Sequence, residues 1–176
     1  MKAAFVGLVG RPSAGKSTLL NRICGHKISI ISPVPQTTRN RVRGICNSPV
    51  GQLVFIDTPG FHLSERKMNL HLTELVSRTL KEAELVLYLV DCTRPPGDEG
   101  RALIALLAPH AGTTVVGLNK TDHAAAKIDE ARRALPFPPQ RVFPISALTG
   151  AGVPELLAEL WTLAPEGERM YPEDYY

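Results

Sequence analysis

One stretch near the start of the chain combines glycine, lysine and hydroxyl side chains at a spacing suited to binding phosphate. Gly10 to Thr18 reads Gly-Arg-Pro-Ser-Ala-Gly-Lys-Ser-Thr. Glycines let the backbone approach an anion closely, and the N–H groups at a helix start attract negative charge. The pattern is typical of a phosphate-binding loop, in which Lys16 contacts the outer phosphates and the Ser17 hydroxyl binds Mg²⁺.

Three more unusual loops follow apolar runs of the kind that form buried strands. These loops are Asp57 to Gly60, Asn119 to Asp122 and Ser146 to Leu148. In a parallel sheet, ligands bind at the carboxyl ends of the strands. We therefore expect these loops and the glycine loop to meet at one edge of a sheet.

The apolar patterns alternate between strand and helix along the chain. Pro33 and Pro35 mark the segment up to Thr38 as a loop, and Pro49 with Gly51 indicates a hairpin. Strands linked by helices predict a parallel sheet covered on both faces. We expect strands at 2–9, 39–47, 53–56, 85–90, 114–118 and 141–145, and helices at 16–25, 69–83, 98–107, 124–135 and 153–163.

The composition is that of an ordinary globular protein. The chain has 176 residues, of which 44% are hydrophobic and 21% charged, and its formal net charge is +3. No apolar run has the length of a membrane span, and the N-terminus lacks the pattern of a signal peptide. Cys24, Cys46 and Cys92 lack a metal-type spacing, so we expect reduced thiols in a cytoplasmic protein.

These loops resemble, in order and spacing, the guanine-nucleotide motifs of translation-factor-class P-loop GTPases. The finer resemblance is to the Era family. It is carried by the glycine loop and its continuation to Asn21, by Gln36-Thr37-Thr38-Arg39, by Asp57-Thr58-Pro59-Gly60-Phe61-His62 and by the ending Tyr171 to Tyr176. The resemblance implies the α/β fold of a P-loop NTPase, with a six-stranded, mostly parallel sheet and helices on both faces.

The resemblance assigns the phosphates and the metal to the first loops. Lys16, Thr38 and Gly60 are the candidate catalytic residues, and Gly60 offers its N–H to the γ-phosphate. Mg²⁺ is expected on Ser17, Thr38 and Asp57, and GTP is the expected substrate. The other expected phosphate-side contacts are Ser13, Ala14, Gly15 and Thr18.

The resemblance assigns the base to the last two loops. The Asp122 carboxylate can accept from guanine N1 and the exocyclic amine, a pair of donors that adenine lacks. Asn119 is expected at the opposite edge of the base, and the Lys120 stem along the ring. The Ala147 N–H is expected to meet the guanine carbonyl, with Ser146 and Leu148 lining the same pocket.

Two residues depart from related enzymes. Phe61 stands where Ras-type enzymes use Gln to orient water, so we expect slow hydrolysis. Ser13 stands where Era relatives carry an Asn that helps some of them bind K⁺, so K⁺ is an optional cofactor with a reduced effect.

Arg11 and Arg39 stay candidates for a built-in arginine finger, and His62 for placing water. Asp91 is interpreted as a strand-end cap.

Three functions stay open at this point. The leading hypothesis is a GTP-hydrolysing switch acting in maturation of the small ribosomal subunit. A P-loop ATPase and a non-catalytic guanine-nucleotide module are the alternatives, and Asn119-Lys120-Thr121-Asp122 argues against the ATPase.

The resemblance also suggests a division of the chain and a set of partners. We expect a GTPase domain at 1–166, and at 167–176 the start of a linker toward a KH domain that this chain lacks. The implied partners are GTP or GDP and, for the full-length protein, the small ribosomal subunit and its RNA, with weak or no RNA binding here. The family further implies a monomer that can associate peripherally with the inner face of a membrane.

Overall fold

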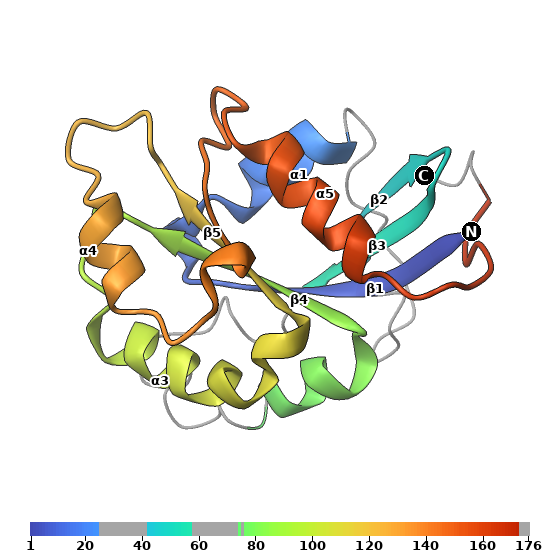
Figure 1. Ribbon diagram of the computed structural model, residues 1–176, viewed down its shortest axis with the longest axis horizontal. Helices are drawn as coiled ribbons and strands as arrows, with labels where there is room; N and C mark the ends of the chain where they lie inside the picture. The colour runs from blue at the N-terminus through green and yellow to red at the C-terminus, as the bar shows by residue number, and fades with distance from the viewer. Residues whose placement is uncertain (25–41, 58–73, 75, 173–176) are drawn as a thin grey trace.

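The computed structural model describes residues 1–24, 42–57, 74 and 76–172, and these form a six-stranded sheet with helices on both faces (Figure 1). The strand order is β2-β3-β1-β4-β5-β6. Neighbouring strands run parallel except for β2 and β3, which form an antiparallel hairpin. The predicted fold class is confirmed.

The strands lie where the apolar runs place them, with small shifts at their ends. They are β1 (Lys2–Val9), β2 (Val42–Ser48), β3 (Gly51–Asp57), β4 (Leu85–Asp91), β5 (Thr114–Asn119) and β6 (Val142–Pro144). The residues predicted as strand at 39–41 lie outside the described part of the chain. The last strand is shorter than predicted, although the Ile145 N–H still donates to the Leu118 carbonyl at 2.8 Å.

The helices cover the two faces of the sheet. They are α1 (Lys16–Cys24), α3 (Gly97–Leu107), α4 (Ile128–Arg133) and α5 (Val153–Leu163), with short 3-10 turns at Pro12–Ala14, Ala108–Thr113 and Pro139–Arg141. Residues 76–82 are also helical, inside the helix predicted at 69–83, of which residues 69–73 and 75 lie outside the described part of the chain. The helix predicted at 124–135 was placed too early, because turns occupy 121–125 and the Ala126 N–H donates to the His123 carbonyl at 3.1 Å.

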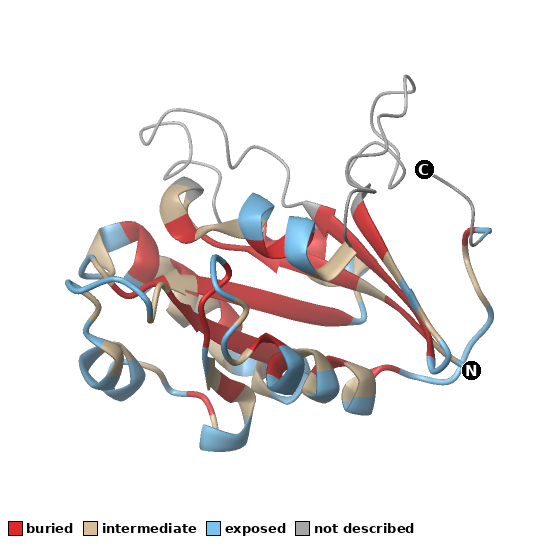
Figure 2. Ribbon diagram, turned by 90° about the horizontal axis from the view of Figure 1, so that it is seen from above, coloured by how far each residue is buried: buried red, intermediate tan, exposed pale blue. Residues whose placement is uncertain are grey.

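Each face of the sheet has its own apolar core. Leu19 and Leu20 of α1 and Leu156 and Leu160 of α5 pack on one face, while Leu103 of α3 packs on the other. Figure 2 shows that the central strands are buried along most of their length. Continuous apolar runs such as Leu85 to Val90 are explained by this two-sided cover.

The cysteines are free thiols, as predicted. Burial, together with the neighbouring Cys46, raises the pKa of Cys24 to about 12. Burial beside Asp91 raises the pKa of Cys92 to about 11. These two thiols therefore stay protonated at neutral pH and behave as core groups.

The segment after α5 returns along the sheet. The Ala3 N–H donates to the Pro165 carbonyl at 3.0 Å, and the Gly167 N–H donates to the Met1 carbonyl at 2.8 Å. Tyr171 is buried in a small apolar cluster with Ile45 and Val54 of the β2–β3 hairpin. Residues 165–171 therefore pack against the sheet.

Candidate nucleotide-binding site

The glycine loop joins β1 to α1 at the carboxyl edge of the sheet. Gly15 has φ +94°, a backbone conformation that favours glycine. A Cβ built on Gly15 would lie 2.4 Å from Asn119 Nδ2. Both the backbone conformation and this close approach explain why glycine stands directly before Lys16.

Asn119 connects three loops with one buried side chain. It is the last residue of β5 and is 2% exposed. Its Nδ2 donates to the Ala14 carbonyl at 2.7 Å, and its Oδ1 accepts from the Ala147 N–H at 2.9 Å. The predicted convergence of the glycine loop with the last two loops is therefore observed in the structure.

These contacts refine the roles predicted for the base. The Ala147 N–H already has Asn119 Oδ1 as its acceptor, so a guanine carbonyl reaching that N–H would compete with Asn119. Asn119 Nδ2 carries two hydrogens, and the Ala14 carbonyl takes one of them. Asn119 can therefore tie the loops together and still offer a donor to a ligand.

Asp122 lies at the surface beside a buried serine. Ser146 Oγ donates to Asp122 Oδ1 at 2.7 Å and accepts from the Thr149 N–H at 3.0 Å. The Thr121 N–H donates to the Ile145 carbonyl at 3.2 Å. Ser146 is buried while Asp122 is exposed. Ser146 thus orients a carboxylate that faces solvent, where a base could approach it.

Arg22 holds the loop at 146–148 from the side of α1. Its Nε donates to the Ala147 carbonyl at 2.8 Å, and its terminal nitrogen donates to the Leu148 carbonyl. Leu148 is 67% exposed and could cover one side of a ligand. The sequence reasoning missed Arg22, because an arginine on a helix carries no motif; only its partners identify its role.

The phosphate side is formed by the first turn of α1. Ser17 and Thr18 are exposed there, Ser13 and Lys16 are half-buried, and α1 has no acidic residue in its first turn. The amino end of such a helix attracts anions. This location fits the predicted phosphate contacts.

The donors predicted for Mg²⁺ are hard oxygen groups, which that ion prefers. The Ser17 hydroxyl is at the start of α1, and Asp57 ends β3, in register with Leu8 of β1. The backbone therefore brings Asp57 to the edge where the glycine loop begins, and the donor set fits the ion. Thr38 and Gly60 lie outside the described residues, as do Arg39, Phe61 and His62.

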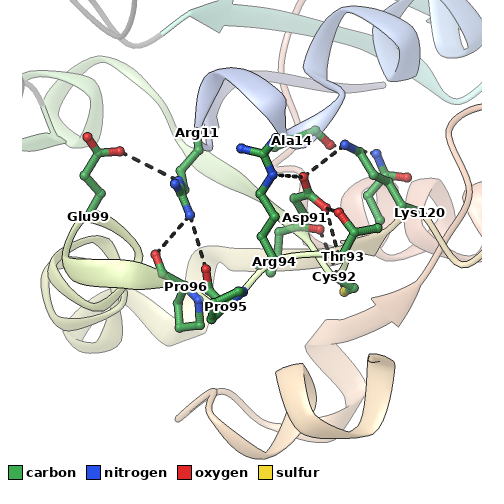
Figure 3. A network of polar contacts seen from close by, with 12 residues as sticks. Arg11, Ala14, Asp91, Cys92, Thr93, Arg94, Pro95, Pro96, Glu99 and Lys120 are labelled. Atoms are coloured by element: carbon green, nitrogen blue, oxygen red, sulfur yellow. Dashed lines mark hydrogen bonds and ion pairs between the residues drawn. The ribbon is translucent and has the colours of Figure 1, made fainter. Parts of the chain in front are cut away.

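Arg11, the second residue of the glycine loop, is directed toward the amino end of α3. Its guanidinium donates to the carbonyls of Pro95 and Pro96, both at 3.3 Å, and lies 3.8 Å from Glu99 (Figure 3). These contacts favour an anchoring role for Arg11 over that of an arginine finger.

A cavity of about 370 Å³ lies between the end of β4, α3 and α4. Arg11 and Asp91 line it, but Gly15, Asn119 and Asp122 do not. It therefore lies beside the converging loops and is distinct from the candidate nucleotide site at those loops.

The family model of the 50S ribosome-binding GTPases matches residues 5–120. The chain belongs to that family. The match includes the glycine loop and Asn119 and Lys120, the first two residues of the loop at 119–122, which we call the base-side loop. Membership agrees with the fold and with the loops that converge on Asn119.

Curated relatives confirm the similarity to the GTPase Era. GTPase Era of Treponema denticola is 49% identical over 100% of this chain and 62% of its own length. That of Treponema pallidum is 47% identical over 96% of this chain and 60% of its own length. The chain thus spans about three fifths of the length of these relatives.

Solved structures of Era also resemble this chain. An Era variant of Aquifex aeolicus, bound to GDP and aluminium fluoride, is 35% identical, with a TM-score of 0.75 over 99% of this chain and 61% of its own. An Era structure in complex with MgGDPNP and nucleotides of 16S ribosomal RNA has a TM-score of 0.77 at the same identity and coverage. The G domain of the Thermotoga maritima iron transporter FeoB shares the fold at 23% identity, with a TM-score of 0.62 over 92% of this chain and 98% of its own.

No helix in the described residues combines the length and the apolar character needed to cross a bilayer.

Proposed function

We propose that this chain binds guanine nucleotides at the carboxyl edge of its sheet and hydrolyses GTP to GDP and phosphate. The observation that carries the proposal is the double hydrogen bond of Asn119, which joins the glycine loop to the loop at 146–148. Ser146 adds to it by orienting Asp122 at the surface. These hydrogen bonds fix the candidate phosphate loop and the candidate base-reading loop relative to each other.

The chemistry asks the protein mainly to position groups and to neutralise charge. Lys16 and the N–H groups at the start of α1 hold the outer phosphates, and the Asp122 carboxylate selects guanine. We propose that Ser17, Thr38 and Asp57 hold Mg²⁺, which supplies positive charge at the phosphates when bound. Gly60 contributes an N–H to the γ-phosphate, so that Thr38 and Gly60 report whether that phosphate is present.

We propose that the intrinsic rate is slow. Phe61 lacks the polar group that orients water in Ras-type enzymes. An arginine finger contributes roughly 10³–10⁵ in rate where one exists, but the contacts of Arg11 favour an anchoring role for that residue. Turnover should therefore lie below about one per second, the lower end of typical enzymes. Ser13 offers no amide carbonyl, so K⁺ in place of Na⁺ should stimulate less than it does after Ser13→Asn.

Nucleotide binding and single-turnover hydrolysis by the purified chain test this proposal. GTP and GDP should bind with Mg²⁺ and compete with each other, while ATP should not compete. Lys16→Ala should lose binding, since each charge-assisted contact is worth on the order of 1.5–3 kcal/mol. Lys127→Ala, which removes a lysine that is 74% exposed in its side chain, is the matched control and should bind like the parent.

The alternative hypotheses give different results in the same experiments. Tight GTP binding without any turnover would support a non-catalytic guanine-nucleotide module, the alternative that Phe61 makes plausible. Competition by ATP would instead support an ATPase.

We further propose that the longer protein of this type acts on the small ribosomal subunit. The family description refers to the 50S subunit, whereas the similar Era structure holds 16S ribosomal RNA, which belongs to the small subunit. We follow the Era structure because its likeness covers nearly the whole chain. Filter binding of the longer protein to a 16S fragment tests this: retention is expected for the longer protein, and weak or no retention for residues 1–176 alone.

We propose that the chain is a cytoplasmic monomer with a GTPase unit at 1–166. In this proposal 167–176 leads toward a further domain, after packing against the sheet as far as Tyr171. The family resemblance adds peripheral contact with the inner membrane face. Sedimentation at rising concentration and flotation with anionic vesicles test these points.

A further inference from the structure

Asp91 is the last residue of β4 and lies in register with Asn119 of β5. This places it directly beside the start of the base-side loop. Its side chain is only 4% exposed. A carboxylate in such a position needs partners, because an unpaired buried charge is strongly unfavourable.

Those partners come from two separate segments. Asp91 Oδ1 accepts from the Thr93 N–H at 2.9 Å and from the Thr93 hydroxyl at 2.5 Å. Asp91 Oδ2 accepts from Lys120 Nζ at 3.0 Å, and Arg94 Nε lies 4.0 Å away (Figure 3). The contacts with Thr93 cap the strand end, as the sequence predicted; the contact with Lys120 reaches into the site.

Lys120 has an unusual backbone of its own. With φ +76° it is the one non-glycine residue at positive φ in the described part of the chain. Such residues persist where the surroundings hold them, and they cluster at functional sites. The ion pair with Asp91 fixes the far end of a long side chain whose backbone is already constrained.

We propose that Asp91 is a positioning residue for guanine nucleotides, acting through Lys120. By holding Nζ, the carboxylate keeps the Lys120 methylenes extended beside Asn119, where they can lie along the face of the base. Thr93 orients the carboxylate in turn. This inference rests on the proposed binding of guanine nucleotides at this edge.

The test is a double-mutant cycle read out as the release rate of a fluorescent GDP analogue from the full 176-residue chain. Asp91→Asn keeps the size of the side chain and removes its charge. It should speed release about tenfold, a size of effect consistent with coupling between residues in contact. Lys120→Met should also speed release, and Asp91→Asn added to it should change the rate less than about twofold.

Two further variants sharpen the result. Thr93→Val removes one hydrogen bond to Asp91 and should speed release only about two- to threefold. Asp98→Asn, at a side chain 94% exposed on α3, should release like the parent.

Two outcomes would overturn the proposal. One is an Asp91→Asn effect of the same factor with and without Lys120, which a general loss of stability would produce. The other is no effect at all. A parent chain that binds no GDP analogue would instead overturn the proposed function, and this inference with it.

Discussion

Two buried amide side chains fix opposite ends of the same sheet. Asn119, at the carboxyl end of β5, bonds to the Ala14 carbonyl and the Ala147 N–H. Gln52, fully buried near the amino end of β3, donates to Asn47 Oδ1 at 2.9 Å and to the Tyr171 carbonyl at 2.8 Å. It also accepts from the N–H groups of Met170 and Tyr171.

The two amides have the same chemistry and different consequences. Asn119 joins loops that carry phosphate- and base-binding patterns, so its contacts shape a candidate site. Gln52 joins the β2–β3 hairpin to the segment after α5, and its contacts fix the path of the chain. A buried amide that bridges distant backbone thus contributes to function only where its partners can contact a ligand.

The largest expected effect is at the base-side loop. Asp122→Asn should change the preference from guanine to xanthine nucleotides, because an amide can donate where the carboxylate only accepts. Two hydrogen bonds to a charged group correspond to roughly 3–6 kcal/mol, or about 10²–10⁴ in relative affinity. Competition between GTP and XTP measures the change. Asp129→Asn, at an exposed acid in α4, is the control, and an Asp122→Asn variant that still prefers GTP would refute this role.

Removing the Asn119 side chain should lower both the affinity for nucleotide and the stability of the fold. Asn119→Ala leaves the Ala14 carbonyl and the Ala147 N–H without their partner, at a cost of about 2–4 kcal/mol. GDP affinity should fall about 100-fold or more, and the free energy of unfolding should also fall. Calorimetry and urea unfolding report the two quantities. Asn21→Ala, at an exposed position of α1, serves for comparison; unchanged GDP affinity would contradict the bridging role.

Removing the Gln52 side chain should lower the stability of the fold without changing the affinity for nucleotide. Gln52→Ala removes four hydrogen bonds and should lower the free energy of unfolding by about 2–3 kcal/mol. GDP affinity at a temperature where the variant is folded should match the parent. Urea unfolding measures the loss, with exposed Gln140→Ala as the matched variant. A large loss of affinity in Gln52→Ala would show that the two ends of the sheet are coupled after all.

The smallest expected effect is the pH dependence of the stability that Asp91, the neighbour of Asn119 on β4, contributes. Burial raises the pKa of Asp91, but hydrogen bonds from Thr93 and Lys120 outweigh it, so the net pKa lies below its ordinary value. The stability that Asp91 contributes is therefore present above about pH 4, the ordinary pKa of Asp, and is lost as pH falls through the folded-state pKa. The difference in unfolding free energy between parent and Asp91→Asn should shrink as pH falls below about 4. A difference that stays constant down to pH 2 would refute this account.

Much of the fold could be predicted because its signals are local. The apolar run at Leu85 to Val90 formed β4 as predicted, and the glycine loop stands between β1 and α1. The start of α4 was predicted too early, because Lys120 to His123 and the residues after them form turns. The hydrogen bonds of these turns, such as that from the Ala126 N–H to the His123 carbonyl, have no signal in the alanine-rich sequence.

The sequence by itself determined which residues are candidates for the chemistry, since a loop pattern such as Gly-x-x-x-x-Gly-Lys-Ser needs only neighbours along the chain. Tertiary structure alone decided which distant groups support those residues. Arg22 meets Ala147 across 125 positions, and Gln52 meets Tyr171 across 119. The packing of α1 and of the segment after α5 against the sheet sets these pairs, because it brings together backbone segments that no local pattern relates. The strand order places Asp91 beside Asn119, and so within reach of Lys120.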